Sequence, residues 1–200
     1  MLKIIVSSIS LLFFVGCSMS NPAVTEYRVH SDVKNIEQTQ SCSYTDKSIK
    51  ISRAFSSNTL MSNEMKYVLG NTKEFSYTES QWAVSPSNAI SSELLKLLRE
   101  SKIFKNTQTS KSRSSSDIIL ETNIEEFVQH FNKDETKSYA TVTISLTLIN
   151  SKDNRVIGTN TFSSNVDTKT LDANGGVDAF NKALSNVLLE SSEWIKKVCR

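Results

Sequence analysis

The chain is poor in the residues that most metal sites and catalytic sites need. It has two histidines, five glycines and two prolines in 200 residues. Neither His30 nor His130 stands at a spacing from a cysteine that is typical of a metal site. The sequence contains no glycine-rich phosphate loop and no G-x-S-x-G motif. We therefore predict no metal site, no cofactor and no catalytic residue, and hence a protein that is not an enzyme.

Three glutamates in one predicted strand are the remaining candidates for acid–base chemistry. They are Glu121, Glu125 and Glu126. Strand alternation sends Glu125 and Glu126 to opposite faces of a sheet. We therefore interpret them as solvated strand residues and not as a catalytic pair.

The chain also lacks an excess of charge of either sign. It carries 23 basic and 21 acidic side chains. If a signal segment that contains Lys3 is removed, the basic count falls by one. A nucleic-acid partner would require a basic face, so this balance argues against nucleic-acid binding. The length suits a single domain.

No apolar run is long enough for a membrane-spanning helix. The longest stretch, residues 4–15, is interrupted by three serines and is shorter than the roughly 20 residues that a span needs. It follows a positively charged start and precedes the small residue Gly16, which is the pattern of a secretory signal peptide. A signal peptide cut near Gly16 and a short uncleaved anchor are the two plain interpretations.

A third interpretation rests on resemblance. Residues 14–17 (FVGC) are similar to a bacterial lipobox, with Phe14 where leucine is usual. The resemblance implies cleavage between Gly16 and Cys17, and lipid attachment to Cys17. Such an anchor holds a protein on a membrane without a spanning helix. Ser18 follows the cysteine where aspartate would favour the inner membrane, so by analogy with enterobacterial sorting we expect the periplasmic face of the outer membrane.

The two remaining cysteines form a candidate disulfide. With Cys17 assigned to lipid, Cys42 and Cys199 can pair, and a bridge persists in an oxidising periplasm. The alternative is two free thiols.

The chain divides into three parts. Residues 1–16 are the predicted signal peptide, residues 17–41 a lipidated tether and residues 42–200 the folded domain. The tether shows no sustained apolar period, with one short strand expected near residues 26–29. At about 3.3–3.6 Å per residue its extended limit is some 80–90 Å.

Periodicity predicts a mixed α/β domain. Strands are expected over 48–55, 64–70, 74–84, 117–131, 138–150 and 155–166, with Gly70-Asn71 as a turn and a bulge near 124–127. In the first strand Ile49, Ile51 and Phe55 share a face. One helix is expected from Pro86 to about Lys102 and another from about Val177 to Val198, both with apolar stripes. Residues 105–117 are predicted to form a polar connection that starts with a short strand.

This order of elements is similar to the ABC-type transport auxiliary lipoproteins, the group that includes the paraquat-inducible lipoprotein. The resemblance covers about residues 45–198. It is carried by Tyr77, Trp82 and Pro86 before the first helix, and by residues 180–184 (FNKAL) with Trp194 in the last. It implies a single α/β domain with helices packed on a mixed sheet.

The resemblance also implies a function. It predicts an auxiliary component of a mammalian-cell-entry (MCE) lipid transport system, whose partners are the MCE protein and the ABC transporter, with phospholipid as a further ligand. Tyr77 and Trp82 are candidate partner contacts, because aromatic residues dominate binding hot spots. The alternative is that both rings pack the first helix onto the sheet. An assembly lipoprotein for an outer-membrane complex, and a lipid carrier with its own apolar cavity, remain open as other functions.

Overall fold

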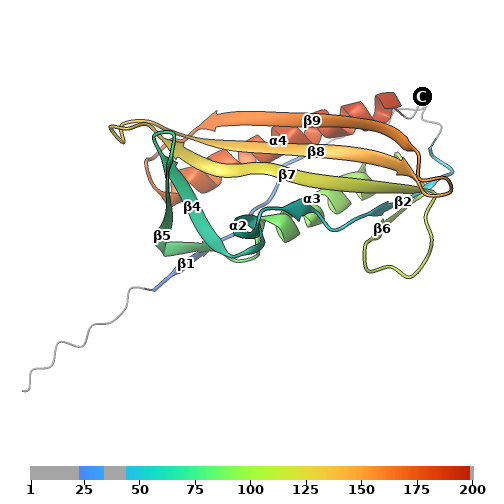
Figure 1. The fold of residues 1–200 in the computed structure, drawn as a ribbon, viewed down its shortest axis with the longest axis horizontal. Coiled ribbons are helices and arrows are strands. Elements are labelled where there is room, and N and C mark those ends of the chain that lie inside the picture. The colour runs from blue at the N-terminus through green and yellow to red at the C-terminus, as the bar shows by residue number, and fades with distance from the viewer. Residues whose placement is uncertain (1–22, 34–43, 199–200) are drawn as a thin grey trace, which may run out of the picture.

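The computed structural model describes residues 23–33 and 44–198, which form one α/β unit (Figure 1). A nine-stranded mixed sheet is covered on one face by helices, so the predicted fold class is confirmed. The strands are β1 (Thr25–Tyr27), β2 (Ser48–Ile51), β3 (Phe55–Ser56), β4 (Glu64–Leu69), β5 (Lys73–Trp82), β6 (Asn106–Thr109), β7 (Ile118–Phe131), β8 (Ser138–Asn150) and β9 (Val156–Asp167). The helices are α2 (Asn58–Met61), α3 (Pro86–Glu100) and α4 (Ala173–Val198). No helix in this part of the chain is both long and apolar enough to cross a membrane.

The long strand β7 organises the sheet. Along one edge it pairs antiparallel with β8, which pairs antiparallel with β9. Along its other edge it pairs in turn with β2, β3 and β4, all parallel. The sheet continues from β2 to β6, and from β4 through β5 to β1.

The β8–β9 hairpin has one apolar face and one hydroxyl-rich face. Five alternate β8 residues are at most 1% exposed and face the helices, as alternation predicts: Ala140, Val142, Ile144, Leu146 and Leu148. On the open face, side chains pair across the two strands as Thr141–Asn165, Thr143–Ser163, Ser145–Thr161 and Thr147–Thr159. We call this row the hydroxyl ladder.

Helix α4 begins at Ala173, four residues before the predicted start. The Asp172 carboxylate accepts a hydrogen bond from the Gly175 backbone N–H at 2.8 Å, as a helix N-cap does. Gly175 and Gly176, which precede the predicted start, lie inside the first turn of the helix. A Cβ atom at Gly176 would lie 2.0 Å from the Gln129 Oε1 atom, so any larger residue there would displace the Gln129 side chain on β7.

Helix α3 begins at Pro86, as predicted, and ends at Glu100. Its stripe residues Ile90, Leu94 and Leu98 are fully buried. Gly70 has a φ of 63°, which a glycine adopts readily, in the predicted turn between β4 and β5.

The expectation for Phe55 was wrong. Ile49 and Ile51 are buried, but Phe55 is 74% exposed. Strand β2 ends at Ile51 and β3 starts again at Phe55 after an irregular connection, so the alternation does not carry across. The four-residue helix α2, which follows β3, was not predicted.

Residues 23–33 are part of the domain and not a free tether. Strand β1 lies parallel to the end of β5, with Tyr27 level with Trp82. The segment then crosses the helices, where the His30 N–H donates to Asn181 at 3.0 Å and the Asp32 N–H donates to Ser185 at 3.0 Å. The Ser31 N–H donates to Glu93 on α3 at 2.9 Å. The predicted boundary at residue 41 therefore does not mark the start of packed structure.

Candidate functional site

A cleft of about 270 Å³ opens on the uncovered face of the sheet, where β4 diverges from β7. Helix α2 forms one wall, the β4–β5 hairpin another, and β7 the third. The charged side chains along it are Glu64, Lys66, Glu74, Glu125, Glu126 and His130. Four larger hollows, of about 290 to 510 Å³, lie elsewhere on the surface, but none of them is lined by Trp82, Phe127 or Phe180. We therefore take this cleft as the candidate site.

The β7 bulge turns two carboxylates toward the cleft. The register shifts between Ile124 and Glu126, so Glu125 is an extra residue with no β8 partner of its own. Ile124 and Phe127, on either side, are both buried. Glu125 and Glu126 consequently share the open face. The bulge itself was predicted correctly, but the expectation that these two glutamates face opposite ways was wrong because the bulge cancels one step of the alternation.

Each of these carboxylates has a defined partner. The Glu126 Oε1 atom lies 2.8 Å from His130 Nε2. The His130 ring stacks on Tyr139, with ring centroids 4.9 Å apart. Glu125 accepts a hydrogen bond from Ser145, which connects it to the hydroxyl ladder. The β7 side of the cleft is thus held in place by side chains of β8.

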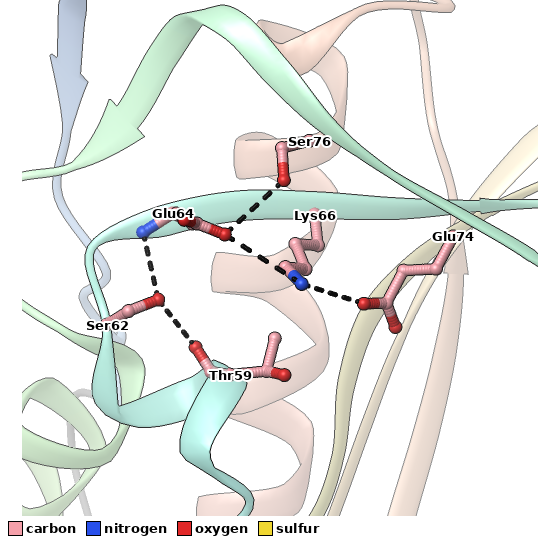
Figure 2. Close-up of polar contacts among 6 residues, drawn as sticks. All are labelled: Thr59, Ser62, Glu64, Lys66, Glu74 and Ser76. Atoms are coloured by element: carbon pink, nitrogen blue, oxygen red, sulfur yellow. Dashed lines mark hydrogen bonds and ion pairs between the residues drawn. The ribbon is translucent and has the colours of Figure 1, made fainter.

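On the opposite side, Lys66 lies between two glutamates (Figure 2). Its Nζ is 2.9 Å from Glu74 Oε1 and 3.8 Å from Glu64 Oε2. The hydrogen bond to Glu74 is the largest cause that raises the pKa of Lys66 above its ordinary value, so the ammonium stays charged. Ser76 donates a 3.4 Å hydrogen bond to Glu64. The cleft as a whole holds four carboxylates against one ammonium and one histidine, and is acidic.

The short helix α2 is joined to this group through Ser62. Its hydroxyl donates to the Thr59 carbonyl at 2.9 Å and accepts from the Glu64 backbone N–H at 3.3 Å (Figure 2). This bridge fixes the α2 wall to the start of β4.

Trp82 lies at the bottom of the cleft and is 2% exposed. Its ring centroid is 5.5 Å from that of Phe127 and 5.5 Å from that of Phe180, and these two phenylalanines stack at 4.3 Å. The three rings join β5, β7 and α4. Trp82 is thus a packing residue, but the helix that it joins to the sheet is the last one, α4, and not the first helix α3 as the packing alternative had it.

Tyr77 lies further along β5, half-buried against Tyr67 at 4.7 Å between ring centroids. Its hydroxyl donates to Gln129 Oε1 at 3.1 Å, and the fully buried Gln129 donates to Ser138 at 2.9 Å. Burial raises the pKa of Tyr77 well above its ordinary value. Tyr77 therefore secures a buried polar connection.

The structure brings together residues that the sequence alone did not. Glu64, Lys66, Glu74 and His130 were not predicted site residues, because their grouping depends on β4 and β7 meeting in space. Cys17 and the predicted cleavage position at Gly16 lie outside the described residues, as do Cys42 and Cys199. Within residues 23–33 and 44–198, no group of three or more histidine, cysteine, aspartate or glutamate side chains is arranged to hold a metal ion.

Comparisons with known proteins identify the fold. No family model and no curated protein matches the sequence. A crystal structure of a Xanthomonas campestris protein of family DUF330 superposes with a TM-score of 0.77 at 16% identity, covering 88% of this chain and 96% of that one. An uncharacterised protein gives 0.62 at 12% identity, covering 88% and 97%. A hypothetical protein from Chlamydia trachomatis gives 0.51 at 8%, covering 77% and 98%. At these identities the likeness shows a shared fold.

Proposed function

We propose that this chain is a lipid-anchored envelope protein that docks onto a partner protein as an auxiliary component of an MCE-type lipid transport system. The lipobox-like residues 14–17 and the family resemblance support the anchor and the pathway. The fold shared with a DUF330 protein is compatible with both. On this proposal the protein is held at the periplasmic face of the outer membrane and catalyses no reaction.

A filled core is the observation that carries the docking role. The face of the sheet under α3 and α4 is occupied by side chains such as Leu120, Leu146 and Leu184, each fully buried. Pockets for drug-sized ligands usually have about 300–1,000 Å³ and a mainly apolar lining. The cleft is smaller, and charged side chains stand among the residues that line it and the four larger surface hollows. These features favour surface contact with a protein over carriage of a lipid inside the domain.

The cleft is the contact that we propose for the partner. Its acidic rim suits a basic side chain of the partner. A basic side chain at this rim, beside Glu64 and Glu74, would bring the partner close to β4 and β5.

Binding to the MCE protein of the same genome tests the proposal. The mature chain carrying Cys17→Ser should be used, because a fragment that starts at residue 42 would lose β1. We expect retention of the chain by immobilised MCE protein. Glu74→Lys should weaken retention, whereas Glu79→Lys, an exposed position on the same strand outside the cleft, should not.

Two outcomes would contradict parts of this proposal. Equal retention of both variants would separate the cleft from the partner contact. No retention of the unsubstituted chain, together with an unchanged envelope after deletion of the gene, would favour the assembly-lipoprotein function.

A further inference from the structure

Strand β9 is a long free edge of the sheet. Among the described residues it pairs only with β8, along twelve residues (Figure 1). At roughly 3.4 Å per residue this edge is about 40 Å long, and about half of its backbone N–H and C=O groups point away from β8. An edge of this length is able to form a full set of hydrogen bonds with another strand.

Along most of its length, the described edge carries no charge, proline or bulge that would prevent such pairing. Residues 156–166 include no charged residue and no proline, and Arg155 and Asp167 flank them. The one register irregularity with β8 lies at the start of the strand, between Leu148 and Ile149. Natural proteins protect exposed edges with charges, prolines, bulges or a covering segment. The sequence of β9 therefore suits an edge that is paired in the working protein.

An apolar groove follows the same edge on the helix side. It has about 390 Å³ and lies between β9 and α4, with Phe162, Leu189 and Trp194 as its apolar lining and Glu190, Glu193 and Lys197 as charged lining residues. Leu189 is 49% exposed. Helix α4 runs antiparallel to β9, since Asn186 donates to Ser164 whereas Trp194 lies beside Gly158. The exposed Leu189 is thus level with the middle of the strand.

We propose that two copies of this chain pair through β9, antiparallel and about a twofold axis at Phe162. This register sets Thr161 opposite Ser163 of the second copy, and Thr159 opposite its Asn165. The hydroxyl ladder already contains the same two combinations, as Thr143–Ser163 at 2.8 Å and Thr141–Asn165 at 2.7 Å. The hydroxyl ladder therefore continues from one copy to the other across the axis. Because the β9 edge complements itself in this way, its pairing partner is a second copy of this chain.

The helix layer fits the same axis. Because Leu189 is level with Phe162, the two apolar grooves would face each other and cover both Leu189 side chains. The edge is about 40 Å long, and the sheet and α4 together make it roughly 20 Å thick. It therefore presents about 800 Å² per copy, which is the size of a standard stable interface. This pairing is independent of the proposed lipid-transport role.

Sedimentation equilibrium of the mature chain carrying Cys17→Ser, under reducing conditions, tests the pairing. We expect twice the mass of one chain. Asn160→Lys places a charge in the groove at the edge, and should raise the dimer dissociation constant about tenfold or more. Thr109→Lys adds the same charge to the exposed end of the other edge strand β6, and should leave the dimer intact. A monomer at the highest soluble concentration, or a dimer that Asn160→Lys does not weaken, would overturn the proposal.

Cross-linking tests the register, and it remains informative if Asn160→Lys fails to fold. In a chain without the three native cysteines, Thr161→Cys with Ser163→Cys should give a disulfide-linked dimer on oxidation. Moving the pair to Gln108→Cys with Ser110→Cys, at the end of β6, should not. An equal yield from both pairs would overturn the assignment of the interface to β9.

Discussion

The indole ring of Trp82, on β5, meets the phenyl ring of Phe180, on α4, edge to face with centroids 5.5 Å apart, although 98 residues separate them in the chain. Phe127 of the bulged strand completes the group. Together with the pairing of β4 and β7, these rings join the β1–β5–β4 part of the sheet to the long hairpin and its helix.

Removal of the indole should therefore destabilise the whole domain. We expect Trp82→Ala to lower the free energy of unfolding by about 3–5 kcal/mol, the usual cost of a large aromatic residue in a core. Urea denaturation followed by circular dichroism measures this. Val84→Ala, at a neighbouring position that is 51% exposed, should change stability by much less. Equal effects of the two substitutions would show that Trp82 is not a core residue.

The hydrogen bond from Tyr77 to Gln129 should make stability sensitive to alkaline pH. Since burial raises the pKa of Tyr77 in the folded state, folded protein holds its proton more tightly than unfolded protein does. The stabilisation from the protonated Tyr77 hydroxyl is complete below about pH 10, which is near the pKa of tyrosine in the unfolded protein. It is lost as the pH rises toward the higher pKa of Tyr77 in the folded protein. Tyr77→Phe should cost about 1–2 kcal/mol at pH 8 by leaving Gln129 without its donor.

The difference between wild type and Tyr77→Phe should shrink above pH 10. Chemical denaturation at several alkaline pH values provides the comparison. Tyr139→Phe, where the ring is 39% exposed, is the control. A constant difference across this range would contradict the assignment.

The stability that the N-cap of α4 contributes should decrease at acidic pH. The backbone N–H of Gly175 is the largest cause that lowers the pKa of Asp172, followed by the Thr170 hydroxyl. Because the pKa of Asp172 is lower in the folded state, its carboxylate stabilises the fold at pH values above about 3.9, the pKa of aspartate in the unfolded protein. This stabilisation is lost as the pH falls through the pKa of Asp172 in the folded protein. Asp172→Ala should cost about 0.5–2 kcal/mol at pH 7 and much less near pH 2, whereas Asp172→Asn should keep most of the cap. Thermal denaturation at the two pH values distinguishes them.

The Cys42–Cys199 bridge remains a prediction, because both cysteines lie outside the described residues. A closed loop of more than 100 residues contributes about 4–5 kcal/mol in the chain-entropy treatment, an upper figure. Alkylation of the unreduced, exported protein should find neither thiol. Two labelled thiols would refute the bridge.

Lipid attachment at Cys17 also remains to be tested. Cys17→Ser removes the sulfur that would carry the acyl groups, so the variant should take up no labelled fatty acid and should leave the membrane fraction. Ser18→Ala keeps the cysteine and should be labelled normally. Equal labelling of wild type and Cys17→Ser would exclude this anchor.

Short-range pattern predicted most of the elements. The alternation in 138–150 and the stripe on α3 were read correctly because each depends on local burial of one face. The errors have a different cause. The start of α4 depends on the fit of Gly176 against Gln129, and the orientation of Glu126 depends on a bulge whose partner is β8. The grouping of Lys66 with the β7 glutamates depends on contacts between distant parts of the chain, which a single sequence does not reveal.

The docking of residues 23–33 also changes how far the domain could travel from a membrane. The predicted tether would have allowed some 80–90 Å, but the chain is paired with β5 from Thr25 onward. If Cys17 carries the lipid, the eight steps from Cys17 to Thr25 span at most about 29 Å. The domain would then lie close to the bilayer surface, with its β1 end facing the membrane. Any partner from the opposite membrane would have to cross most of the periplasm itself.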